Sequence, residues 1–184
     1  MSQRRVFLVT GLPATGKTTL ARALARTLAA PLLSKDAIKE PLLDILGAAD
    51  RTASRRLSDA SFAVLFELAN EYLPLLGTVV MEGNFRPGEH ELVLQVLLAR
   101  HAPVSCIQVL CRVPEPLRQE RLALRAADPA RHPGHRDGLW VAQAAVEADG
   151  FLDIAGSQRV EAGDRSEPTH SCALIRSLTN RQLV

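Results

Sequence analysis

The run GLPATGKTT, from Gly11 to Thr19, limits the possible fold more than any other stretch of this chain. It fits G-x-x-x-x-G-K-[ST], a glycine-rich loop between a strand and a helix that binds nucleotide phosphates. Glycine lets the backbone point successive N–H groups inward, and the following helix adds its positive dipole end. We expect Lys17 to reach the β- and γ-phosphates and Thr18 to coordinate Mg²⁺. The residues expected to bind the nucleotide here are Gly11, Leu12, Pro13, Ala14, Thr15, Gly16, Lys17, Thr18 and Thr19.

Both flanks of this loop have the pattern that the motif requires. Residues 5–10 form a short apolar run that suits a buried parallel strand. After the loop, Leu20, Leu24 and Leu28 recur every four residues, while two arginines share another face. That spacing predicts an amphipathic helix. Strand, loop and helix therefore follow one another in the expected order.

The composition predicts one domain, residues 1–184, with a core of aliphatic side chains, because hydrophobic residues make up 47% of the chain and aromatic ones 4%. A net charge of +2 argues against a nucleic-acid partner. No apolar run is long enough to span a membrane, and the N-terminus lacks the pattern of a signal peptide. We therefore expect a cytoplasmic protein whose Cys106 and Cys111 are reduced core thiols. The sequence leaves the oligomeric state open.

Strands and helices alternate along the chain. Strands are also expected at residues 31–34, 78–81, 104–111 and 159–162, and helices at 36–46, 54–73, 89–100, 114–127, 139–148 and 172–183. Such alternation predicts an α/β fold, a parallel sheet with helices on both faces. Ligands of these sheets bind beyond the carboxyl ends of the strands, so functional residues should follow each strand directly.

Asp36 and Lys39 follow the second predicted strand. Asp36 could serve as the general base for an acceptor hydroxyl, or it could cap the following helix. Pro41 leaves the start of that helix uncertain, because proline is usual only in a first turn. Lys39 lies one turn after Asp36, where it could bind the acceptor or be a solvated charge.

Glu82, Asn84 and Arg86 follow the third predicted strand. A carboxylate there could complete the Mg²⁺ site through water, although the usual residue is aspartate. Glu82 is therefore a candidate for either the metal or the acceptor. Asn84 and Arg86 could hold the acceptor or a phosphate, or they could serve the turn.

Arginines dominate the helix after the fourth predicted strand. Arg118, Arg121 and Arg125 fall on one helical face, which either meets anions or is solvated. Phosphoryl transfer needs such positive charge, because the moving group spreads negative charge over its oxygens. The loop that follows contains Arg131 and the pair His132-x-x-His135, which lacks a nearby cysteine and does not suggest a metal site.

The quoted loop, LLSKDAIKE, VVMEGNFRP, the arginine helix and the RHPGH loop together resemble the small P-loop kinases of the AAA_33, or predicted-kinase, type. That group is similar to chloramphenicol phosphotransferase, the zeta-toxin kinases and the kinase domain of polynucleotide kinase. The resemblance covers roughly residues 4–150. It implies the strand order 2-3-1-4-5, a small lid at about residues 126–138, and Asp36 as the catalytic aspartate. Where these kinases often have arginine three residues after that aspartate, this chain has Lys39.

The resemblance further implies that Arg121 packs on adenine and that Arg125 contacts phosphates. We therefore expect an ATP- and Mg²⁺-dependent phosphotransferase that acts on a small-molecule hydroxyl, with Lys17, Asp36, Arg125 and Arg131 as its catalytic residues. Two alternatives remain. One is a polynucleotide 5′-hydroxyl kinase, which should have a basic groove. The other is a P-loop ATPase or nucleotide-dependent binding protein without an acceptor.

Overall fold

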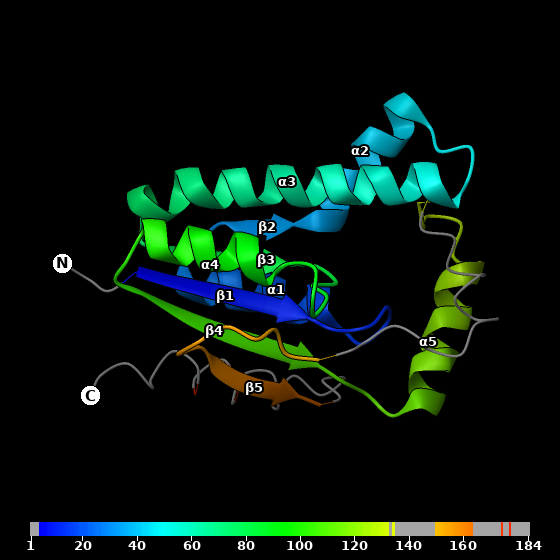
Figure 1. Ribbon diagram of the computed structural model, residues 1–184. Coiled ribbons are helices and arrows are strands. Elements are labelled where there is room, and N and C mark those ends of the chain that lie inside the picture. Colours follow the sequence, from blue (N-terminus) through cyan, green and yellow to red (C-terminus); the bar gives the residue numbers. More distant parts are fainter. Residues whose placement is uncertain (1–3, 133, 135–149, 164–173, 175–176, 178–184) are drawn as a thin grey trace.

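Five parallel strands form one sheet in the computed structural model, which describes residues 4–132, 134, 150–163, 174 and 177 (Figure 1). Its strand order is β2-β3-β1-β4-β5, so the predicted α/β fold and the order 2-3-1-4-5 are confirmed. The strands are β1 (Arg4–Thr10), β2 (Leu32–Ser34), β3 (Thr78–Glu82), β4 (Val104–Cys111) and β5 (Gln158–Ala162).

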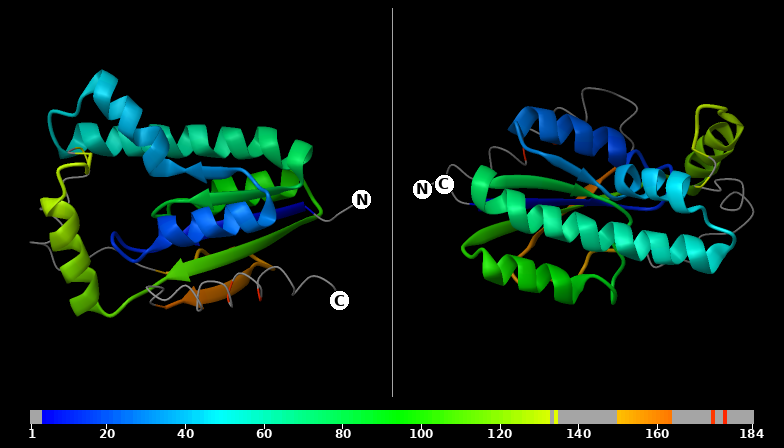
Figure 2. Two further views of the ribbon diagram at one scale, coloured as in Figure 1. Left: turned by 180° about the vertical axis from the view of Figure 1, so that it is seen from behind. Right: turned by 90° about the horizontal axis from the view of Figure 1, so that it is seen from above.

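Helices cover both faces of the sheet. They are α1 (Lys17–Leu28), α2 (Lys35–Leu46), α3 (Arg51–Leu76), α4 (Glu91–Arg100) and α5 (Glu115–Ala127). Helix α1 lies on one face, and α3 and α4 lie on the other, whereas α5 stands apart beyond the carboxyl ends of the strands (Figures 1 and 2). The helices expected at residues 139–148 and 172–183 lie outside the described residues.

The core consists of two layers, one on each face of the sheet. Along β1, Val6 and Leu8 join the layer under α3 and α4, while Phe7 and Val9 join the layer under α1. This alternation follows from the period of two along a strand, and all four residues are fully buried because the sheet is covered on both faces. The sheet is thus a rigid support for the loops at its carboxyl edge.

Helix α3 is longer than the sequence predicts. It begins after Asp50, whose carboxylate accepts a hydrogen bond from the Ala53 amide at 2.7 Å, a typical N-cap. It ends at Gly77, where φ is 72° and the chain turns into β3. Helix α2 contains Pro41 in its interior, so this proline does not mark the helix start.

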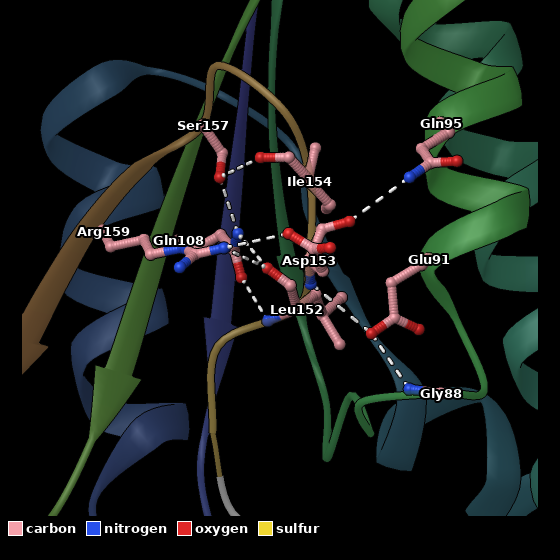
Figure 3. A network of polar contacts seen from close by, with 9 residues as sticks. All are labelled: Gly88, Glu91, Gln95, Gln108, Leu152, Asp153, Ile154, Ser157 and Arg159. Atoms are coloured by element: carbon pink, nitrogen blue, oxygen red, sulfur yellow. Dashed lines mark hydrogen bonds and ion pairs between the residues drawn. The ribbon is translucent and has the colours of Figure 1, made fainter.

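A segment that the sequence patterns did not reveal completes the core beyond residue 150. Leu152 and Ile154 are buried beneath α4. The Gln108 side chain on β4 is fully buried, and its amide donates to the Leu152 carbonyl and accepts from the Leu152 N–H at 3.0 and 2.8 Å (Figure 3). Because these bonds satisfy the buried amide, Gln108 fixes this segment against the sheet.

The two described cysteines are buried free thiols, as expected for core positions. Burial raises the pKa of Cys106 to about 12, which keeps its thiol protonated. Within the residues that the structure describes, no helix combines the length and hydropathy needed to cross a bilayer.

A buried histidine holds the loop that follows β3. His90 is 7% exposed, and its ring lies 4.2 Å from that of Phe62 between centroids. The Arg86 backbone N–H donates to His90 Nδ1 at 2.9 Å. Only a ring that is unprotonated at Nδ1 can accept this bond, so the loop geometry requires neutral histidine.

We expect the stability of the protein to fall as the pH drops below about 6.5, the ordinary pKa of histidine. Burial lowers the pKa of His90 in the folded protein. The unfolded chain therefore binds more protons between the lowered pKa and 6.5, and stability rises with pH in that window. One such group contributes at most about 1.4 kcal/mol per pH unit.

Urea unfolding from pH 5.5 to 7.5 would measure this dependence, and His90→Asn is the matched variant. Asparagine keeps an acceptor for the Arg86 amide but does not titrate. The variant should lose part of the slope, while His101, whose pKa is also lowered by burial, still contributes the remainder. Identical slopes in both proteins would show that His90 does not titrate with folding.

Candidate nucleotide and phosphoryl-transfer site

The glycine-rich loop lies at the carboxyl edge of the sheet and connects β1 to α1. Gly11 has φ 142°, and a Cβ on it would lie 2.4 Å from the Cys111 carbonyl oxygen on β4. Gly16, with φ 86°, precedes the first residue of α1. Ala14 also has a positive φ, 69°, which costs energy for a residue with a side chain. Steric space and backbone angle together therefore require glycine at position 11.

Lys17 and Thr18 are the first two residues of α1, and their polar atoms bond to different parts of the site. The Lys17 ammonium is within the loop and donates to the Leu12 carbonyl at 3.3 Å. The Thr18 hydroxyl donates to Glu82 Oε1 at 3.2 Å. Ser34, at the end of β2, donates to Glu82 Oε2 at 2.6 Å. Glu82 is 1% exposed and thus joins the ends of β2 and β3 to the loop.

The oxygens of Thr18 and Glu82 suit Mg²⁺, which prefers hard oxygen ligands. The structure brings together the two residues that the sequence assigned to the metal. Among the described residues, no group of three or more His, Cys, Asp or Glu side chains is arranged to hold a metal ion. His135 of the His132-x-x-His135 pair lies outside those residues.

Asp36 lies in the first turn of α2, directly after β2. Ser34, not Asp36, occupies the N-cap position, so the reading of Asp36 as the helix cap is wrong. The Lys35 ammonium contacts Asp36 Oδ1 at 2.8 Å, and the Asp36 side chain is 34% exposed. The Asp36 carboxylate is therefore partly exposed, and helix capping does not explain why an aspartate is present at this position.

One cavity of about 850 Å³ joins the loop, the start of α2 and the arginines of α5. It contains most of the expected nucleotide-binding residues, together with Asp36, Arg121, Arg125 and Arg131. Gly11, Leu12 and Pro13 do not line it, although the Leu12 carbonyl accepts hydrogen bonds from Lys17 and Thr15. Its lining residues are Ala14, Thr15, Gly16, Lys17, Thr18, Thr19, Arg22, Leu32, Ser34, Asp36, Ala37, Glu40, Arg121, Leu124, Arg125 and Arg131.

Only two of the three arginines predicted on one face of α5 line this cavity. Arg121 and Arg125 do, whereas Arg118 is 3% exposed and forms two hydrogen bonds with Glu115, at 2.6 and 2.7 Å. The bonds from Arg118 and Gln119 lower the pKa of Glu115 to about 2. Arg118 thus anchors the first turn of α5, which corrects the grouping of all three as a phosphate-binding face.

The residues that follow α5 lie against α2. They are residues 128–132 and 134, inside the segment where the lid is expected. Arg131 Nη1 lies 4.0 Å from Glu40 Oε1, and His132 Nε2 lies 2.9 Å from Asp44 Oδ1. Gly134 lies so close to Leu43 that a Cβ on it would be 2.5 Å from that side chain. The described part of the segment therefore contacts one face of α2, with Arg131 at the cavity.

The remaining predicted acceptor residues are not among those that line this cavity. Lys39 is 8% exposed and donates to the Ser54 hydroxyl at 2.9 Å, so the alternative of a solvated charge is wrong. Arg86 lies 3.6 Å from Glu89 and belongs, with the half-buried Asn84, to the loop after β3. The structure thus brings Asp36 to the cavity, places Glu82 directly behind Ser34, and leaves these three outside the cavity lining.

The sequence patterns did not point to several residues of this region, namely Arg22, Leu32, Ser34, Lys35, Ala37, Glu40 and Leu124. Arg22 and Leu124 line the cavity, and Lys35 contacts Asp36. Arg22 lies one turn after Thr18 on α1, a helical spacing that could have indicated it. Leu124 carries no chemical signal, and the burial of Lys35 depends on tertiary packing.

A parallel sheet of order 2-3-1-4-5 with a glycine-rich phosphate loop after its first strand defines a small nucleotide-binding protein of the P-loop kinase type. The chain belongs to the AAA_33 family, described as an AAA domain, whose sequence pattern matches residues 6–143.

Similar solved structures include proteins described as kinases. A candidate kinase from Chloroflexus aurantiacus J-10-fl is 34% identical over 100% of both chains, with a TM-score of 0.80. An APS kinase from Mycobacterium tuberculosis, determined with AMPPNP and APS, is 23% identical over 97% of this chain and 98% of its own, with a TM-score of 0.58. A sugar kinase from Janibacter sp. HTCC2649 is 13% identical over 97% and 95%, with a TM-score of 0.54. The last two share the fold. No curated protein matches the chain.

Proposed function

We propose that the protein is an ATP- and Mg²⁺-dependent phosphotransferase that moves the γ-phosphate to a hydroxyl group of a small molecule. The observation that carries this proposal is the position of Asp36, a partly exposed carboxylate in one cavity with Lys17 of the phosphate loop and the arginines of α5. A carboxylate in that place can receive the proton of an acceptor hydroxyl. ATP as the donor also agrees with the expected cytoplasmic location.

The loop would bind the triphosphate through its backbone N–H groups and the Lys17 ammonium. Thr18 would hold Mg²⁺ directly, and Glu82 would complete the site. The hydrogen bond from Thr18 to Glu82 supports the metal role of Glu82 over acceptor binding. When bound, Mg²⁺ would neutralise charge on the β- and γ-phosphate oxygens.

In the proposed reaction the acceptor oxygen forms a bond to the γ-phosphorus as the bond between that phosphorus and the β,γ-bridging oxygen breaks. The acceptor proton passes to Asp36, and ADP leaves. Arg125 and Arg131 would neutralise charge on the moving group, and Arg121 would pack on the base. We propose that the chain is a single domain in which residues 126–138 act as a lid that excludes water from the cavity.

A screen of hydroxyl compounds with Mg-ATP, followed by mass spectrometry for a gain of one phosphate, tests the proposal. Sugars, nucleosides, aminoglycosides and other small alcohols would form the panel, with a 5′-hydroxyl oligonucleotide as a separate arm. A phosphorylated small molecule is the expected result. Phosphorylation of the oligonucleotide alone, or release of inorganic phosphate without any phosphorylated product, would instead support one of the two alternatives.

Asp36→Asn should reduce phosphate transfer by about 10²–10⁴-fold, the usual contribution of a general base. Asparagine is nearly isosteric but cannot take a proton at neutral pH. ATP affinity should remain near that of the wild type, whereas the melting temperature should fall, because the buried Lys35 ammonium loses its charged partner. Turnover within a few-fold of the wild type would remove Asp36 as the base.

A further inference from the structure

Lys35 occupies an unusual place at the start of α2. The residue is 7% exposed, and its Cβ lies over the loop after β3, where a Cβ on Gly83 would approach it to 3.2 Å. The same position on Gly83 would lie 3.2 Å from the Phe62 ring. The base of the Lys35 side chain thus lies close to Gly83 in a buried place, while its ammonium contacts Asp36 Oδ1 at 2.8 Å.

Two physical costs oppose a lysine at this position. Burial of an ammonium group loses hydration, and the first turn of a helix has a positive dipole end that disfavours cations. An apolar side chain would avoid both costs here. Their compensation is the contact with Asp36, the proposed general base. A residue that violates local preferences in this way is expected near functional sites.

Lys35 does not line the cavity, whereas Asp36 does. The ammonium is therefore placed to act on the carboxylate and not on the nucleotide or acceptor. We propose that Lys35 is a positioning residue that holds the Asp36 carboxylate in its charged form and in its orientation toward the acceptor. This inference rests on the proposed function, because it gives Lys35 a role only through Asp36.

The other charged groups around Asp36 come from several elements. Those that share its cavity are Lys17 and Arg22 on α1, Glu40 on α2, Arg121 and Arg125 on α5, and Arg131 after α5, and Glu82 lies behind Ser34. These groups are unchanged in a Lys35 variant. A change in the pH dependence of such a variant therefore reports the loss of the Lys35 ammonium.

The test uses Lys35→Met, which keeps an unbranched side chain of similar length and removes the charge, in the otherwise unchanged protein. Until an acceptor is known, the reaction is hydrolysis of Mg-ATP, with water in the acceptor position and inorganic phosphate as the readout. We expect the rate constant to fall about 10- to 100-fold, the loss that follows from misplacing a catalytic group by about 1 Å. The acidic limb of the pH–rate profile should also move to higher pH, because the carboxylate has lost a neighbouring cation. ATP affinity should stay unchanged.

Chemical rescue separates a charge effect from a packing effect. Lys35→Ala leaves a space for propylammonium, which should restore part of the lost rate. Propanol, of similar shape but neutral, should not restore it. Rescue by both compounds, or by neither together with a lowered melting temperature, would show that Lys35 serves packing alone and would overturn the proposal.

A double variant distinguishes this inference from the proposed function. If Lys35 acts through Asp36, then Lys35→Met should cause no further loss in an Asp36→Asn background. The positioning role would be overturned by an equal loss in both backgrounds, or by a Lys35→Met protein with the wild-type rate and pH profile. In either case, slow turnover of Asp36→Asn would still support Asp36 as the general base. Turnover of Asp36→Asn near the wild-type rate would overturn the assignment of Asp36 as the general base.

Discussion

Arg125→Ala should lower turnover by about two to five orders of magnitude while the protein remains folded. That range spans the loss of a single donor to a developing charge and the loss of an arginine that neutralises a transferring phosphate. Arg125 lines the cavity from the last turn of α5, as Arg121 does one turn earlier, whereas Arg118 is bonded to Glu115. Single-turnover phosphate release and ATP affinity would be measured on the same preparation.

Two further variants make the Arg125 experiment specific. Arg121→Ala should mainly weaken ATP binding, because Arg121 is proposed to pack on the base. Arg26→Ala removes an exposed arginine of α1 that does not line the cavity and should leave both quantities unchanged. Small and equal effects of Arg125→Ala and Arg121→Ala would mean that the arginine face of α5 is only solvated.

The sequence predicted the sheet well because its signals there are local and strong. The glycine-rich loop requires a strand before it and a helix after it, and the apolar runs of β3 and β4 cannot be solvated. Predicted and observed bounds of β4 agree, residues 104–111. The strand order came from the resemblance to a known family, since pattern alone does not say which strands are neighbours.

Side-chain roles were harder to predict, because spacing gives a face but not the partners on it. Arg118, Arg121 and Arg125 share a helical spacing, yet Glu115 three residues earlier takes Arg118 out of the site. Lys39 reads as a surface charge until α3 packs against α2 and buries it beside Ser54. Ser54 lies on a different helix from Lys39, which spacing cannot reveal, whereas Glu115 lies at the i−3 position of Arg118, a neighbour that helical spacing could have indicated.

The segment from residue 150 to 157 shows a second limit of sequence patterns. It has no regular helix or strand, so its apolar residues have no period to detect. Its place in the core depends on Gln108, a polar residue in an apolar strand, and on Gln95, which donates to the Asp153 carbonyl at 3.2 Å (Figure 3). A buried glutamine in a strand is the signal that could have suggested a partner segment.

Lys17→Ala should abolish phosphate transfer and weaken ATP binding about ten- to hundredfold. The lysine is 9% exposed and lies inside the loop, where its ammonium already contacts the Leu12 carbonyl, so little entropy is lost when it binds a phosphate. A hydrogen bond to a charged group contributes about 1.5–3 kcal/mol, which corresponds to the expected change in affinity.

The identity of the phosphates that Lys17 contacts gives this prediction an internal control. Because the lysine should reach the β- and γ-phosphates, its loss should weaken ATP and ADP binding but leave AMP binding almost unchanged. Thermal shifts with each nucleotide measure this, since a ligand that binds the folded state raises the melting temperature by an amount that grows with the logarithm of its concentration divided by its Kd. Equal weakening of all three nucleotides would indicate a distorted loop instead of a lost contact. A variant that transfers phosphate at the wild-type rate would contradict the assignment of this loop to the donor nucleotide.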